Sequence, residues 1–238
     1  MILKSKDFKD VAKTVLAATD SSELSTLTET LELKTVGNVL YLNVTNKEYY
    51  ASVKFQLAGE EEFHASVNAN LFLKLVAAVT TEDIELTVTD KVMTVKANGT
   101  YQIPLIFEND TMMEVPEIKI ENKTVEMPVS SAILEAVNNY NIKQLDIGTI
   151  GKPVQKMFYF DNEGCLTFTS VGACVTSFTL PTPVKVLFNR RLVNLFKLFK
   201  DETVTMSLGY DPLPGSDTIV QTKVSFTSSK ICLSFGPG

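Results

Sequence analysis

The sequence predicts an α+β protein of two domains, each made of two copies of a unit in which a strand and a helix precede three further strands. Four short apolar segments end on Ser or Asn, and a helical spacing of apolar residues follows each one. Runs that alternate apolar with polar residues, the pattern of half-buried strands, come after each helical segment. Successive copies are about 60 residues apart, a period that indicates a duplicated structural unit.

Helices are predicted to begin after Ser5, Asn68, Ser130 and Asn189. A Ser or Asn side chain at this position accepts a hydrogen bond from an unpaired N–H group of the first helical turn. Apolar residues stand three and seven positions after each cap, which places one apolar stripe against a core. These pairs are Phe8 and Ala12, Leu71 and Leu75, Ile133 and Val137, and Leu192 and Phe196.

Strands are predicted where the alternation persists between turn signals such as Gly37-Asn38 and Asn98-Gly99. They cover residues 27–33, 39–44, 49–55, 63–67, 84–89, 92–96 and 101–107, then 145–147, 156–160, 166–169, 174–180, 203–208, 219–226 and 231–235. The alternation stops between residues 108 and 123, which we expect to link the domains. The predicted domains are therefore residues 1–120 and 121–238.

Length and composition suit a soluble protein with packed cores. The chain has 238 residues, of which 45% are hydrophobic. Its three cysteines lack the spacing of metal ligands or of a disulfide framework, which suits a reducing compartment. No apolar run reaches the roughly 18 residues that a membrane-spanning helix needs, so we expect a soluble, unexported protein. The formal net charge of −6 argues against nucleic-acid binding unless basic residues gather on one surface.

Basic residues do gather on the predicted helices. Lys6, Lys9 and Lys13 share one face of the first helix, away from its apolar stripe. Lys74 lies on the second helix. Residues 190–200, around the last helix, contain no acidic residue and four basic ones: Arg190, Arg191, Lys197 and Lys200. Long cationic side chains suit non-specific contact with a phosphate backbone. The alternative is an ordinary solvated surface, since two aspartates lie beside the first stripe.

Signals of catalysis are missing from the sequence. His64 is the only histidine, and its place in a strand favours a structural role. No nucleophile motif accompanies it, and no glycine-rich phosphate loop occurs. The acidic residues 60–62 fall in a predicted turn without further metal ligands beside them. We therefore expect a protein that is not an enzyme and has no metal or cofactor, unless distant segments assemble an acid pair.

Several segments, in this order, are similar to segments of the DNA sliding clamps. Residues 37–46, 64–76 and 113–118 resemble the first domain of the bacterial DNA polymerase III beta subunit. Residues 125–130 and 184–196 look more like the proliferating cell nuclear antigen of eukaryotes and archaea. The resemblance extends over essentially the whole chain and depends on the order and spacing of these segments.

This resemblance implies the DNA-clamp fold: a closed ring of six domains, with antiparallel sheets outside and helices lining a hole that duplex DNA passes through. The function would be mechanical, because a ring around DNA tethers a polymerase to its template without gripping it. On this mapping the residues that face or border the hole are Lys6, Lys9, Lys13, Lys74, Arg190, Arg191, Lys197 and Lys200.

The resemblance also implies partners. DNA polymerase and the clamp loader would bind through short peptide motifs in an apolar pocket beside the domain linker. The residues carried over to this pocket are Val44, Tyr49, Met113, Val115 and Pro212. For Met113 and Val115, and for Met112 beside them, the alternative is that they only hold the linker on the first domain. Edge strands at residues 101–107 and 173–180 would join neighbouring copies.

Two domains per chain imply that three copies complete a ring of six. We therefore expect a homotrimeric, cytoplasmic processivity factor of a bacterial or phage-like replication system. The alternative within the family is that the chain is the first two domains of a three-domain clamp, which closes as a dimer. A rival from another class is a two-domain structural or binding protein, such as a virion or scaffold component, without a role on DNA.

Overall fold

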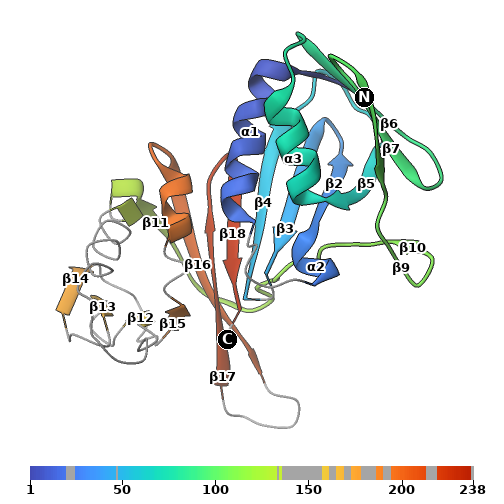
Figure 1. Ribbon diagram of the computed structural model, residues 1–238. Coiled ribbons are helices and arrows are strands. Elements are labelled where there is room, and N and C mark those ends of the chain that lie inside the picture. The colour runs from blue at the N-terminus through green and yellow to red at the C-terminus, as the bar shows by residue number, and fades with distance from the viewer. Residues whose placement is uncertain are drawn as a thin grey trace, which may run out of the picture. The chain divides into compact units, whose positions relative to one another are not determined.

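A computed structural model of the chain separates it into two compact units, Met1–Glu117 and Ile118–Gly238 (Figure 1). The sequence places this boundary after residue 120. The structure describes residues 1–19, 25–46, 48–132, 134–135, 157–160, 165–168, 173–177, 186–189, 194–212 and 219–236.

The first unit, Met1–Glu117, contains two copies of the predicted repeat, which consists of a strand, a helix and three further strands. The first copy consists of β1 (Ile2–Lys4), α1 (Ser5–Ala18), β2 (Thr30–Val36), β3 (Val39–Thr45) and β4 (Tyr49–Gln56). The second copy consists of β5 (His64–Asn68), α3 (Ala69–Ala78), β6 (Asp83–Val88), β7 (Val92–Lys96) and β8 (Thr100–Pro104). A one-turn helix, α2 (Thr26–Glu29), precedes β2, and a hairpin of β9 (Phe107–Glu108) and β10 (Thr111–Met112) follows β8.

The two copies exchange their first strands. Within the first unit the strand orders are β1-β6-β7-β8 and β4-β3-β2-β5, with neighbours antiparallel. The first strand of each copy therefore extends the three-strand sheet of the other copy; Ile2 of β1, for example, lies opposite Glu85 of β6. Because each sheet needs strands from both copies, the pair of copies is the folding unit.

The second unit repeats this exchange. Its strand orders are β11-β16-β17-β18 and β14-β13-β12-β15. Its described elements are β11 (Lys123–Ser130), β12 (Met157–Phe160), β13 (Cys165–Phe168), β14 (Ala173–Ser177), β15 (Val186–Asn189), the 3₁₀ helix η1 (Asn194–Phe199), β16 (Thr203–Pro212), β17 (Ile219–Thr227) and β18 (Ile231–Phe235). The strand orders of both units thus repeat one arrangement, in line with the duplication predicted from the sequence.

The core of the first unit lies between the helices and the strands. Figure 1 shows α1 and α3 side by side over strands β2 to β5, and the two helices contact each other. Phe8 of α1 is fully buried, and its ring centroid lies 5.3 Å from that of Phe55 on β4 and 6.2 Å from that of Phe72 on α3. Phe8 therefore joins both helices to the sheet.

Aromatic side chains also hold η1 in the second unit. The ring of Phe196 lies 4.9 Å from Phe226 and 6.3 Å from Phe235, measured between centroids. Leu195, Phe196 and Phe199 are buried, as the predicted core face of the last helix requires. Leu192, the fourth residue of that face, lies outside the described residues.

The predicted helix caps differ in their outcome. At α3 the prediction is confirmed, because the Leu71 N–H donates to Asn68 Oδ1 at 3.0 Å. At α1 it is wrong: Ser5 is the first helical residue, and Lys4 precedes it without a side-chain cap. The Ser5 N–H instead donates to Glu82 O at 2.8 Å. Its hydroxyl is buried and has no hydrogen-bond partner in the part of the chain that the structure describes.

This difference predicts opposite effects of two alanine substitutions. Asn68→Ala removes a helix cap and should lower the free energy of unfolding by about 1 kcal/mol. Ser5→Ala removes an unpaired buried hydroxyl and should be neutral or slightly stabilising. Urea unfolding of the two variants beside the parent chain measures both values. A larger loss for Ser5→Ala than for Asn68→Ala would contradict this assignment of the caps.

The core face of α3 also differs from the prediction. Leu71 is 52% exposed and Leu75 is half-buried, whereas Phe72, Leu73 and Val76 are buried. The buried stripe, which also includes Ala69, is thus rotated around the helix from the face that the spacing from the cap predicts. The physical reason is that α3 is apolar around most of its circumference, so the sequence pattern alone does not select a face.

The segment before β2 is a second difference. Residues 27–29, predicted as strand, belong to α2. Ser25 caps this helix, since its hydroxyl accepts a hydrogen bond from the Thr28 N–H at 3.3 Å while Thr28 Oγ1 accepts one from the Ser25 N–H at 3.2 Å. The Gly37-Asn38 turn between β2 and β3 is confirmed, and Gly37 has a φ of 58°.

An ion pair in the second unit predicts an acid-sensitive contribution to stability. Lys230 Nζ lies 2.7 Å from Glu202 Oε1, and the Ser229 hydroxyl donates to Glu202 Oε2 at 3.2 Å. The hydrogen bond from Lys230 lowers the pKa of Glu202 below its ordinary value of 4.5. A lowered carboxyl pKa in the folded state stabilises the fold above the ordinary pKa, and this contribution disappears as the pH falls through the folded-state value.

We therefore expect Glu202→Gln to be less stable than the parent chain at pH 7, with the difference shrinking as the pH falls below 4.5. Urea unfolding of both chains between pH 7 and about pH 3 measures the difference. A difference that stays constant over this range would show that the ion pair is not its source.

Among the described helices, none combines the length and apolar character needed to cross a membrane.

Candidate nucleic-acid interface

The exposed face of α1 presents lysines. Lys6 and Lys13 are exposed, whereas Phe8 and Ala12 are buried on the opposite side of the helix. Lys13 Nζ lies 3.5 Å from Asp10 Oδ1, and both side chains are largely exposed. A pair of this kind contributes little to stability, so the lysine remains available to another anion.

Lys9 differs from the other two lysines of α1. It is half-buried, and its ammonium group donates a hydrogen bond to the carbonyl of Val79, the C-cap residue directly after α3. A cation at this position interacts favourably with the partial negative charge at a helix C-terminus. Lys9 therefore links α1 to α3, a contact that sequence spacing does not reveal.

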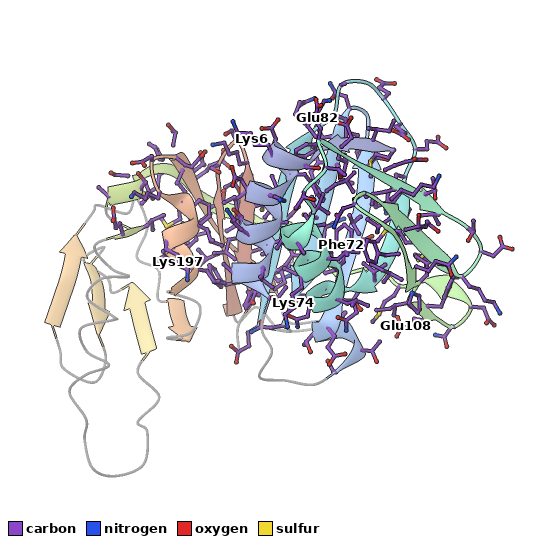
Figure 2. The ribbon with its side chains drawn as sticks, turned by 45° about the horizontal axis from the view of Figure 1, so that its top comes forward. Lys6, Phe72, Lys74, Glu82, Glu108 and Lys197 are labelled. Atoms are coloured by element: carbon purple, nitrogen blue, oxygen red, sulfur yellow. The ribbon has the colours of Figure 1, made fainter. Side chains whose placement is uncertain are left out.

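The second helix adds one lysine. Figure 2 shows Lys6 on α1 and Lys74 on α3, the two helices that lie side by side in Figure 1. Lys74 is exposed, and Leu71, one turn earlier on α3, is exposed as well. The exposed side chains of these two helices thus include Lys6, Lys13 and Lys74 together with Asp7, Asp10 and the apolar Leu71.

In the second unit, Lys197 of η1 is exposed (Figure 2). Lys200, directly after η1, is exposed as well. Leu195, Phe196 and Phe199 of the same segment face the core. The segment is therefore amphipathic in the way the sequence predicts, with its basic side chains in solvent. Arg190 and Arg191 lie outside the described residues.

Acidic residues moderate the charge near the start of α1. A groove there is lined by Lys4, Ser5, Lys6, Asp7, Lys9, Asp10, Lys13, Thr80, Thr81 and Glu82. Lys4 Nζ lies 2.9 Å from Asp83 Oδ1 and 3.0 Å from Glu82 Oε1, and hydrogen bonds to Asp83 and then Glu82 raise the pKa of Lys4 to about 12. This mixture of charges suits weak, reversible contact with phosphates rather than tight binding.

The linker residues predicted to bind peptides are packed into the first unit. Met113 and Val115 are buried. Thr30 Oγ1 donates to Met113 Sδ at 3.4 Å, and the Val115 N–H donates to Glu32 Oε2 at 3.3 Å. The Ser66 hydroxyl donates to the Met113 carbonyl. These contacts hold this part of the linker on the first unit.

The other predicted pocket residues have a similar environment where they are described. Val44 and Tyr49 are buried, and the Tyr49 hydroxyl donates to the carbonyl of Ala18. Pro212 is the last residue of β16, opposite Ile219 of β17, and its side chain is outside the described set. A peptide pocket formed by these residues stays a prediction.

The two strands expected to join neighbouring copies, β8 and β14, both lie at the edge of a described sheet. β8 pairs with β7, and β14 pairs with β13; neither has a described partner on its other side. Tyr101 in β8 and Phe107 in β9 are 37% and 41% exposed. An edge that presents backbone groups beside exposed aromatic rings is suited to pairing with another chain.

His64 lies in β5 and contacts a residue that sequence analysis missed. Its Nε2 atom is 3.1 Å from Oε1 of Glu32, a buried residue of β2. Glu114 in the linker lies beside this pair. The three residues are far apart in the sequence, and only the pairing of β2 with β5 and the path of the linker bring them together.

Among the comparisons with known proteins, the matches to solved structures support the fold. No protein-family model matches the sequence, and the curated proteins contain no match. The DNA polymerase III subunit beta of Pseudomonas aeruginosa matches with a TM-score of 0.73 at 14% identity, over 99% of this chain and 64% of that chain. The Helicobacter pylori beta clamp bound to a DNA ligase peptide matches with a TM-score of 0.71 at 14% identity, over 99% of this chain and 65% of that chain.

The DNA polymerase III beta subunit of Thermotoga maritima also matches, with a TM-score of 0.71 at 12% identity, over 99% of this chain and 63% of that chain. The chain thus spans 63 to 65% of the length of these three proteins. Sequence identities of 12 to 14% support a shared fold but not a shared activity or shared site residues. The chain has the fold of the DNA sliding clamps, as the order and spacing of its sequence segments predict.

Proposed function

We propose that the protein is a sliding clamp, a non-enzymatic processivity factor that encircles duplex DNA and tethers a replicative polymerase. One observation carries the proposal. The chain is acidic and has the clamp fold, yet exposed lysines lie on or directly beside its helical segments: Lys6, Lys13, Lys74, Lys197 and Lys200. The net charge of −6 makes the rest of the surface repel DNA, so an attraction confined to the helices would orient the ring around the duplex.

The weakness of each contact fits a ring that slides. The lysines of α1 share their surface with aspartates, and long cationic side chains follow the phosphate backbone without reading bases. Affinity for DNA would then come from topological linkage rather than from strong individual contacts. Lys9, Arg190 and Arg191 belong to the proposed lining as well, with Lys9 also engaged at the end of α3.

The proposed assembly is a homotrimer. Each chain supplies two clamp units, so three chains supply the six domains of a ring. The edge strands β8 and β14 would pair between neighbouring copies, with Tyr101 and Phe107 covered in the interface. Identical head-to-tail contacts around a closed ring would cover the edges of β8 and β14 in every copy.

The proposed protein partners are a DNA polymerase and a clamp loader that bind through short peptide motifs, in the cytoplasm of a bacterial or phage-infected cell. The match to a beta clamp solved with a DNA ligase peptide supports this class of partner. The proposed pocket lies around Val44, Tyr49, Met113, Val115 and Pro212. Because Met113 and Val115 are buried, peptide binding there would require movement of the linker.

Light scattering over a dilution series tests the proposed assembly. We expect a mass of three chains that falls to one chain on dilution. A persistent monomer would contradict the homotrimer and favour a chain that corresponds to part of a three-domain clamp. A stable oligomer that shows no affinity for DNA would favour the rival structural role.

A further inference from the structure

Three side chains with metal-binding atoms converge on one face of the first unit. Glu32 lies in β2, His64 begins β5, and Glu114 lies in the linker after β10. One ligand atom from each residue lies within 4.8 Å of the others. Within this group, His64 Nε2 and Glu32 Oε1 are 3.1 Å apart.

The strands hold two of these side chains in place. In the antiparallel pair of β2 and β5, Lys34 lies opposite His64 and Glu32 lies opposite Ser66. Glu32 and His64 are therefore diagonal neighbours on the same face of the sheet. Side chains on paired strands are held more precisely than side chains on loops, which favours a defined binding geometry.

The carboxylate of Glu32 is also oriented by its surroundings. Its side chain is 3% exposed. Oε2 accepts hydrogen bonds from Asn43 Nδ2 at 3.1 Å and from the Val115 N–H at 3.3 Å. Oε1 is thereby directed toward His64. Outer hydrogen bonds of this kind orient carboxylate ligands in metal sites and strengthen metal binding.

The set of donors favours one class of metal. Calcium and magnesium prefer oxygen atoms alone, whereas an imidazole nitrogen with two carboxylates suits zinc and similar divalent transition metals. Zinc lies about 2.0–2.2 Å from nitrogen and oxygen ligands, so tetrahedral ligand atoms are roughly 3.3 Å apart. The 3.1 Å between His64 Nε2 and Glu32 Oε1 is close to this value.

We propose that Glu32, His64 and Glu114 form a binding site for a divalent transition metal of the zinc class, with a fourth position open to water. Glu114 stands between Met113 and Val115, which are buried on the first unit. A metal held by all three ligands would therefore fasten the linker to β2 and β5.

Lys34 would compete with the metal for the Glu114 carboxylate. Its Nζ atom lies 3.0 Å from Glu114 Oε1, in a partly exposed ion pair. A metal and this ammonium group would both draw on the Glu114 carboxylate and repel each other. Removing the ammonium group should therefore tighten metal binding, whereas a purely structural cluster would gain no metal affinity from the same change.

Calorimetric titration of the full, untagged chain with zinc chloride near pH 7.5 tests the site. We expect one zinc ion per chain, a fall in affinity of at least about 10-fold in Glu114→Gln, and tighter binding in Lys34→Gln. Glu114 is exposed, so its replacement should leave the fold intact. Glu85→Gln is the matched control, because Glu85 pairs with Lys96 across β6 and β7 in another exposed ion pair and should bind zinc like the parent chain.

Thermal unfolding and cobalt absorption give independent results on the same proteins. Free zinc at about 100 times Kd should raise Tm of the parent chain by about 5 °C or more, and less in Glu114→Gln. Cobalt should give visible absorption bands at one equivalent in the parent chain. Absence of stoichiometric binding, or equal affinity in the parent chain and Glu114→Gln, would overturn the proposal. The outcome does not depend on whether the protein encircles DNA.

Discussion

Replacing Lys6, Lys13, Lys197 and Lys200 together with glutamate should nearly eliminate the direct, salt-sensitive contact with duplex DNA while the chain remains folded. All four side chains are exposed, and of the four only Lys13 has a described ion pair, a long one with Asp10. Each phosphate that a lysine neutralises contributes about 0.9 to the slope of log affinity against log salt concentration. The parent chain should therefore show a steep salt dependence that is lost in the variant.

A second variant distinguishes the effect of where the lysines lie from the effect of how many charges are changed. Lys91, Lys96, Lys119 and Lys123 are exposed and lie on strands, turns and the linker rather than on helices. Their replacement with glutamate changes the net charge by the same amount. Fluorescence anisotropy with a labelled duplex over a range of salt concentrations compares the two. Equal weakening in both variants would mean that overall charge, and not the helical surface, governs binding.

Phe8→Ala should lower the free energy of unfolding of the first unit by about 3–5 kcal/mol. The Phe8 ring is fully buried and lies against rings from β4 and α3, so its removal leaves a cavity between two helices and a sheet. Surrounding side chains collapse only partly into such a space, which adds a cavity cost to the lost hydrophobic burial. A loss of this size is a large fraction of the stability of an ordinary domain.

Leu71→Ala is the control for this prediction. Leu71 is a large apolar residue of α3 that is 52% exposed, so its truncation should change stability by no more than about 0.5 kcal/mol. Urea unfolding at one low protein concentration, followed by circular dichroism, measures both variants. Similar losses in the two would contradict the placement of Phe8 at the centre of the core.

The repeated unit could be predicted because its signals are local. Alternation at period two shows strands, and Asn68 marks a helix start through a hydrogen bond to a residue three places on. The exchange of β1 and β5 between the copies could not be predicted, because many strands share the same alternation and only three-dimensional packing selects their partners. The face of α3 was missed for a related reason, since Leu71 and Phe72 are equally apolar and only the sheet distinguishes them.

Some features of the candidate site could likewise be predicted from the sequence, and others could not. Exposure of Lys6, Lys13 and Lys197 follows from their positions opposite the apolar stripes, and the structure confirms it. The contact of Lys9 with the end of α3 depends on how two helices pack. The cluster of Glu32, His64 and Glu114 depends on strand pairing and on the path of the linker. Contacts between residues this distant in sequence leave no periodic pattern that could reveal them.

Retention on circular DNA tests the central claim most directly. Chains diluted until they dissociate are mixed with a nicked circular plasmid and concentrated again, so that rings close around the DNA without a loader; the complex is then washed at high salt. A sliding clamp should remain on the circle and leave when a restriction enzyme linearises it. Equal retention on circular and linear DNA, or loss from both, would contradict a ring that encircles the duplex.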